Sequence, residues 1–156
     1  MTDVAGKWGD SVAERGFAQV PNYLLLLNQF LERENRLTPT ELLVLIQLAG
    51  NWWRKGELPF PSVETLARRC GTSSRQIQRA VGHLESLGLV KRVKRRAQGI
   101  IASNAYDLEP LVHTLALIAD AFPNEFPRRA VARQLDAGNQ TRAPKKIVIR
   151  RKVKAD

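Results

Sequence analysis

The feature that most constrains this fold is a pair of helix-forming segments separated by a turn of about three residues. Ser62 is placed to cap the first segment, and Gly71 stands where a helix prefers to end on a left-handed residue. Ser73 and Gln76 then have the spacing of a capping box, and the helix that they begin stops at Gly88. The sequence therefore predicts two short helices that a tight turn holds against each other.

Apolar side chains recur at helical spacing along both segments, and each set predicts one buried face. Helical phase turns these side chains to one side of the helix and leaves the polar ones on the other. The positions expected to face the core are Val63, Leu66, Ala67 and Cys70 in the first helix, and Ile77, Ala80, Val81, Leu84 and Leu87 in the second.

Two further helices are predicted before this pair. Leucines and Phe30 recur at helical spacing from Asn22, which indicates a short helix. Thr38, Pro39 and Glu41 then form a strong helix start, because Thr and Glu fit a capping box and proline favours the first helical position. The apolar stripe expected of this second helix consists of Leu42, Leu45, Ile46, Ala49 and either Trp52 or Trp53, with the other tryptophan packed on the following loop.

A β-hairpin is predicted directly after Gly88. Leu89, Val90 and Val93 favour a strand, residues 97–104 carry small and polar turn formers, and residues 105–108 read as the returning strand, with Tyr106 in the hairpin core. Residues 110–122 then form a last helix, which is unusually apolar.

These elements predict a mainly α fold with a small β-hairpin and extra helices at both ends. We expect a flexible N-terminal arm over residues 1–20 and one domain over residues 21–122. Residues 123–156 should form a C-terminal extension, with a short helix at 128–135, a linker at 138–144 and a disordered cationic tail from Arg142 to Asp156.

The balance of charge is strongly basic. Lys and Arg number 25 against 15 Asp and Glu, giving a formal net charge of +10. Charge of this size fits a nucleic-acid partner, but it also fits a basic protein that is merely soluble. The placement of the charged residues has to decide between the two.

Several classes of function are not expected. Cys70 is the only cysteine, and His83 and His113 lack partners at metal-ligand spacing, so we expect no disulfide, metal or cofactor. No catalytic motif appears, which argues against an enzyme. No apolar run approaches the roughly 20 residues of a membrane helix. A cytoplasmic, nucleoid-associated protein is the prediction.

Helical phase places a distinct set of side chains on the outward face of the helix after Gly71. At about 100° per residue, Arg75, Gln78 and Arg79 point away from the apolar side, together with Gly82. Arginine pairs with guanine and glutamine with adenine in the major groove, so these three are the first candidates for reading bases. The next candidates, near the helix start, are Ser73, Ser74 and Gln76.

The stretch from about Thr38 to Leu108 resembles winged helix-turn-helix DNA-binding proteins. The residues that carry the resemblance are Leu66-Ala67, Gly71, Ser73, Ile77, Arg79, Val81, Leu84 and Gly88-Leu89-Val90. In that family a small residue lets the first helix pack closely, glycine makes the turn and hydroxyls cap the recognition helix. The resemblance implies double-stranded DNA as the partner.

The hairpin carries five basic residues, and the resemblance implies that it lies along phosphate or in the minor groove. Neighbouring side chains of a strand alternate between two faces, so some of the five must point away from DNA. The sequence does not choose among Lys91, Arg92, Lys94, Arg95 and Arg96. The cationic tail would add phosphate attraction that does not depend on sequence.

Val20–Tyr23 and Ser103–Leu108, taken with this motif, look like the winged-helix domains of bacterial plasmid and phage replication proteins. The same architecture serves bacterial transcription regulators. A regulator of a mobile element's own genes is the first expectation, and an origin-binding replication factor and a protein-interaction module are the alternatives. The apolar 110–122 helix could also join two copies as a homodimer, although packing on its own core would explain it as well.

Overall fold

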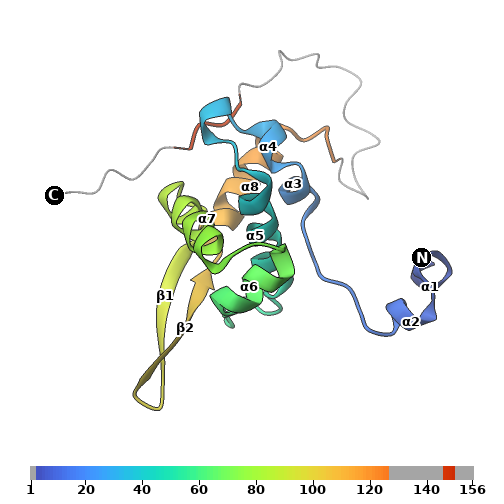
Figure 1. Ribbon diagram of the computed structural model, residues 1–156. Coiled ribbons are helices and arrows are strands. Elements are labelled where there is room, and N and C mark those ends of the chain that lie inside the picture. The colour runs from blue at the N-terminus through green and yellow to red at the C-terminus, as the bar shows by residue number, and fades with distance from the viewer. Residues whose placement is uncertain (1–2, 127–145, 150–156) are drawn as a thin grey trace.

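Helices dominate the described part of the chain, and a two-stranded antiparallel hairpin lies between the two longest of them, which confirms the predicted fold class (Figure 1). The computed structural model describes residues 3–126 and 146–149. In chain order its elements are α1 (Val4–Trp8), α2 (Asp10–Ala13), α3 (Asn22–Leu25), α4 (Leu27–Phe30), the 3-10 helix η1 (Arg33–Asn35), α5 (Pro39–Gly50), α6 (Val63–Cys70), α7 (Ser74–Ser86), β1 (Lys91–Ala97), β2 (Ile100–Asp107) and α8 (Glu109–Ala121).

The predicted helix starts form as local hydrogen bonds. The Thr38 hydroxyl accepts from the Glu41 backbone N–H at 3.2 Å, and the Glu41 carboxylate accepts from the Thr38 N–H at 3.4 Å, which completes a capping box. Ser73 accepts from the Gln76 N–H at 3.2 Å. Within the described chain Gln76 returns no side-chain bond to Ser73, so only half of the second capping box forms.

Helices α5, α6 and α7 pack together around the core. All five predicted apolar positions of the second motif helix are buried, and so are Leu66 and Ala67 in α6. In α5 the prediction was partly wrong: Leu45 and Ala49 are buried, but Val44 and Leu48 are buried as well, whereas Leu42 is only half-buried. Because α6 and α7 both cover α5, its buried face is wider than a single stripe.

The hairpin is longer than the sequence predicted. Its turn comprises only Gln98 and Gly99, whose φ angles of 53° and 78° suit the two-residue type I′ turn of a hairpin. The expected turn over residues 97–104 is therefore wrong, because cross-strand pairing extends β2 back to Ile100. A bulge adds one residue to β2 between the partners of Val93 and Arg95.

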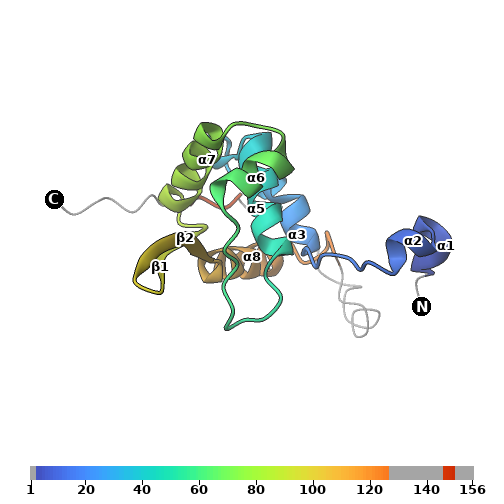
Figure 2. The same ribbon diagram turned by 60° about the horizontal axis from the view of Figure 1, so that its bottom comes forward.

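The N-terminal arm contains two short helices that the sequence pattern does not predict. The Asp3 carboxylate caps α1 by accepting from the Gly6 N–H at 2.8 Å. Neither α1 nor α2 contributes a buried residue. Figure 2 shows both helices standing apart from the body of the molecule, at the end of an extended segment.

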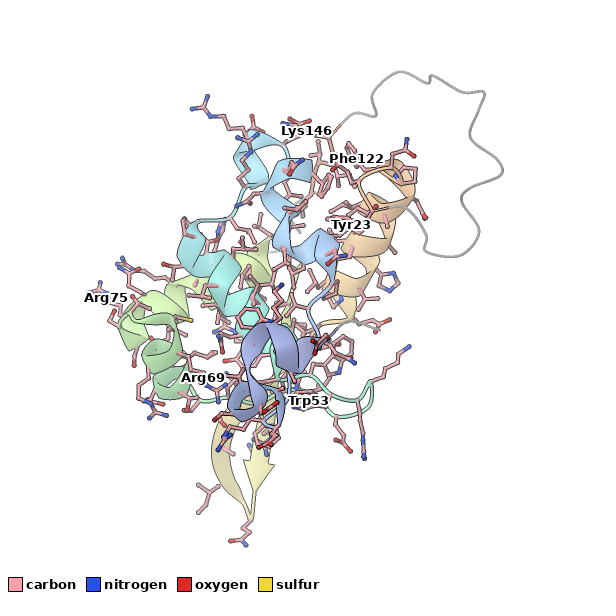
Figure 3. All side chains as sticks on the ribbon, turned by 90° about the vertical axis from the view of Figure 1, so that its right-hand side faces the viewer. Tyr23, Trp53, Arg69, Arg75, Phe122 and Lys146 are labelled. Carbon is pink, nitrogen blue, oxygen red and sulfur yellow. The ribbon has the colours of Figure 1, made fainter. Side chains whose placement is uncertain are left out.

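The last helix, α8, packs against α3. Leu111 and Ile118 are buried, and the Tyr23 hydroxyl donates to the Phe122 carbonyl at 2.7 Å, close to where Figure 3 labels both residues. Leu117 is 62% exposed on the outer side of α8. Among the described residues, no helix has the length and apolar character needed to cross a membrane.

Part of the C-terminal segment is ordered against the body. Ile147 forms a parallel bridge with Leu31, in which its N–H donates to the Phe30 carbonyl at 3.1 Å. The expectation of a disordered tail is therefore wrong for Lys146–Ile149, because the alternating isoleucines give this short stretch an apolar side that packs on the core. The predicted 128–135 helix, the 138–144 linker and the rest of the tail lie outside the described residues.

Candidate nucleic-acid interface

The turn between α6 and α7 fixes how α7 is presented. Gly71 adopts φ 67° and ψ 37°, the left-handed conformation predicted for it, and the Thr72 N–H donates to the Ala67 carbonyl at 3.0 Å. Leu66 and Ala67 are buried against the core. Helix α7 therefore leaves the turn with one face packed and the opposite face toward solvent.

The solvent face of α7 carries the three side chains predicted to read bases. Arg75, Gln78 and Arg79 are exposed, and none of their side chains makes a hydrogen bond or ion pair with another described residue. Figure 3 shows Arg75 at the edge of the molecule. This face thus offers two guanidinium groups and one carboxamide to an outside partner.

The candidates at the start of α7 have different surroundings. Ser73 uses its hydroxyl oxygen to cap the helix, Ser74 is half-buried and Gln76 is exposed. Ser73 therefore positions α7, and its oxygen already accepts one bond before any partner arrives. Ser74 and Gln76 stay predicted contacts.

Two of the five hairpin cations already have partners. The Arg92 backbone N–H donates to the Glu85 carboxylate at 2.9 Å, and its guanidinium donates to the same group at 3.3 Å. The Arg95 guanidinium lies 3.8 Å from the centroid of the Phe60 ring, in a cation–π contact. Lys91, Lys94 and Arg96 are exposed.

The Arg92–Glu85 contact connects the end of α7 to the start of β1. Partial burial raises the pKa of Glu85, but the hydrogen bonds and charge of Arg92 outweigh it, so this pKa lies below its ordinary value. Glu85 is therefore a carboxylate at neutral pH. The ion pair therefore links the hairpin to the end of α7.

The regular alternation of β1 separates its cations into two sets. The extra residue of the bulge lies in β2, so β1 keeps a period of two and Arg92, Lys94 and Arg96 share one face. That face lies toward α7, because Arg92 reaches Glu85 and its cross-strand partner Tyr106 is buried. Lys91 and Arg95 belong to the opposite face.

The loop between α5 and α6 is present as the sequence predicts, but its contact with the hairpin was not predicted. The Tyr106 N–H donates to the Pro59 carbonyl at 2.9 Å, and the Ser103 hydroxyl donates to the Phe60 carbonyl at 3.3 Å, so this loop runs along β2. The run Pro59-Phe60-Pro61 favours an extended backbone, and this is the feature of the sequence that could have indicated a segment running along β2.

A second missed contact joins two core helices. His83 Nδ1 of α7 contacts the carboxylate of Glu41 in α5, and Glu41 is a buried residue. The two residues are 42 positions apart, so no local pattern could reveal their contact. In residues 3–126 and 146–149, no three His, Cys, Asp or Glu side chains gather as a metal site.

Comparison with known proteins agrees with this geometry. Residues 35–90 match a protein family described as a helix-turn-helix domain. No curated protein matches the sequence. The matched region contains α5, α6 and α7, and a domain of this kind indicates DNA binding. Residues 35–90 therefore match a helix-turn-helix domain in sequence and in the order of their helices, and the antiparallel hairpin that follows is consistent with a winged helix-turn-helix.

Proposed function

We propose that this chain binds a specific sequence of double-stranded DNA and regulates transcription of a mobile element's own genes. The observation that carries the proposal is the free outward face of α7. Arg75 and Arg79 have the donors to bind guanine bidentately, and Gln78 has the donor and acceptor to bind adenine. A major groove about 12 Å wide admits a single helix that presents such side chains.

The hairpin supplies contacts to the DNA backbone in this proposal. Lys94 and Arg96 lie on the face of β1 that is turned toward α7, and both are exposed. They are the cations that reach phosphate beside the groove in which α7 lies. Arg92 and Arg95 instead brace the hairpin, through Glu85 and Phe60.

The proposed activity is binding without a catalytic step, at the nucleoid, by a dimer that reads paired half-sites. The dimer rests on the exposed apolar side chains of α8, of which Val112 and Leu117 are 40% and 62% exposed. In a symmetric dimer the two α7 helices would meet half-sites about one helical turn apart.

Footprinting on the DNA around the chain's own gene tests the regulatory role. A regulator protects one short site that overlaps a promoter, and the protection spans two half-sites. Protection of an iterated array instead would contradict regulation and favour replication. A chain that protects no site, while it captures other proteins, would contradict DNA reading altogether.

A further inference from the structure

Residues 3–17 of the N-terminal segment carry apolar side chains that the described chain leaves uncovered. From here on, the arm means these residues alone. Trp8 and Phe17 are 56% and 46% exposed, and their ring centroids lie 6.4 Å apart. Val4 and Val12 are exposed beside them in sequence. Figures 1 and 2 both show α1 and α2 away from the body, so this apolar group meets water. A gathered apolar patch of this kind marks an interaction surface.

The body has an uncovered apolar surface of its own, where the arm joins it. A cavity of about 550 Å³ lies between the segment that follows the arm, α3, the end of α5 and α8. Its walls include Val20, Leu24, Trp52, Leu111 and Leu115. An incoming chain segment with exposed apolar side chains would cover these walls.

We propose that the arm of one copy docks into the cavity of a second copy, so that two chains exchange arms and form a symmetric dimer. Residues 18–21 form one wall of the cavity, and from there the chain runs away from the body. To enter its own cavity, the arm would have to turn back around the segment that builds the wall. Reciprocal exchange between two copies avoids that reversal, and exchange of identical elements is a low-cost route to dimers.

The position of the arm leaves the DNA-binding face free. In Figures 1 and 2 the arm lies on the opposite side of the body from α7 and the hairpin. Arm exchange gives the dimer of the proposed function a specific contact, with α8 contributing to the cavity wall. It does not require DNA, so it can be tested separately from DNA binding.

Sedimentation of the full chain without DNA tests the exchange. At micromolar concentration the chain should be a dimer. The double variant Trp8→Ala/Phe17→Ala should weaken dimerisation by roughly 30-fold or more, as truncation of aromatic anchors does, and the body should still fold because α1 and α2 bury nothing. Val112→Glu, at a partly exposed position in the cavity wall, should have the same effect. Leu43→Ala, on the exposed side of α5, is the matched control and should leave the dimer unchanged.

Mixing the variants gives a sharper result. The arm variant keeps an intact cavity and the Val112→Glu variant keeps an intact arm, so an equimolar mixture should form dimers that neither forms alone. A wild-type chain that stays monomeric overturns the proposal. So does a double arm variant that dimerises as well as the wild type, which would assign the contact to α8 alone.

Disulfide trapping identifies which copy receives the arm. In a Cys70→Ser background, Trp8→Cys and Val112→Cys should oxidise to a covalent dimer on a non-reducing gel. A disulfide within one chain would show that the arm folds back and would overturn the exchange. If variants of α7 abolish DNA binding while the dimer persists, that separates a failure at the DNA interface from a failure of the exchange.

Discussion

At the scale of single residues, Gly82 is a helical position at which the fold itself gives no reason for glycine. It lies inside α7 with ordinary helical backbone, and a side chain added there would meet nothing within 4 Å. Neither conformation nor internal packing therefore requires glycine. Gly82 shares the outward face with Arg75 and Arg79, so we infer that its missing side chain allows close approach of DNA.

Gly82→Ala should therefore separate stability from binding. The substitution should raise the free energy of unfolding by about 1 kcal/mol, because alanine favours the helix interior over glycine by that amount. Affinity for a duplex should fall, since the added methyl group holds α7 away from the groove. Thermal denaturation and duplex titration of one preparation measure both effects. Unchanged affinity in a stabilised variant would show that nothing approaches this position.

At the scale of elements, the ion pair between Glu85 and Arg92 connects α7 to the hairpin. Its contribution to the free energy of unfolding depends on pH. Because the pKa of Glu85 in the folded chain lies below its ordinary value near 4.5, the stabilising effect is fully present above that value. It is lost as the pH falls through the folded pKa of Glu85, when the carboxylate takes up a proton.

Glu85→Gln should lower the melting temperature at pH 7. The loss in free energy of unfolding should be at most about 1 kcal/mol, because the pair is partly exposed. The difference from the wild type should shrink as the pH falls below 4.5 and should vanish once the pH is below the folded pKa of Glu85. Glu57→Gln, which removes the exposed partner of Arg54, serves as the control and should change little at either pH. A Glu85→Gln deficit that is the same at both pH values would contradict an ionic role for Glu85.

The helical elements could be predicted from sequence because their determinants are local. Thr38, Ser62, Ser73 and Gly71 each act within one turn of the helix that they begin or end. The full hairpin length was not predicted: Ile100 and Ile101 favour a strand, but Ser103 and Asn104 favour a turn and belong to β2 through its pairing with β1. The docking of Ile147 on Leu31 depends on contacts between distant parts of the chain, which carry no local signal.

In the candidate site, too, some features could be predicted from local sequence and others depend on contacts between distant elements. Helical phase placed Arg75, Gln78 and Arg79 on the outer face of α7, where the structure has them exposed. It could not show which hairpin cations have partners, because Glu85 and Phe60 come from other elements. The contact between His83 and Glu41 could not be predicted either, because it also joins two separate elements.

At the scale of the whole molecule, separate surfaces are available for separate tasks. The helix α7 and the hairpin lie on one side of the body, and the arm lies on the other (Figure 1). The bridge at Ile147 anchors the start of the C-terminal tail next to α4, at the end of the body remote from the hairpin tip. This arrangement puts the proposed DNA-binding face and the proposed dimer contact on separate surfaces.

Selection of bound duplexes from a random library tests the central claim, that the outer face of α7 reads DNA sequence. The wild type should enrich one short motif. Arg79→Ala should lose the preference at one base pair and about 1–3 kcal/mol of affinity for that motif, whereas Lys94→Ala should weaken binding to all sequences alike. If a variant with alanine at positions 75, 78 and 79 enriched the same motif as the wild type, the claim would be contradicted.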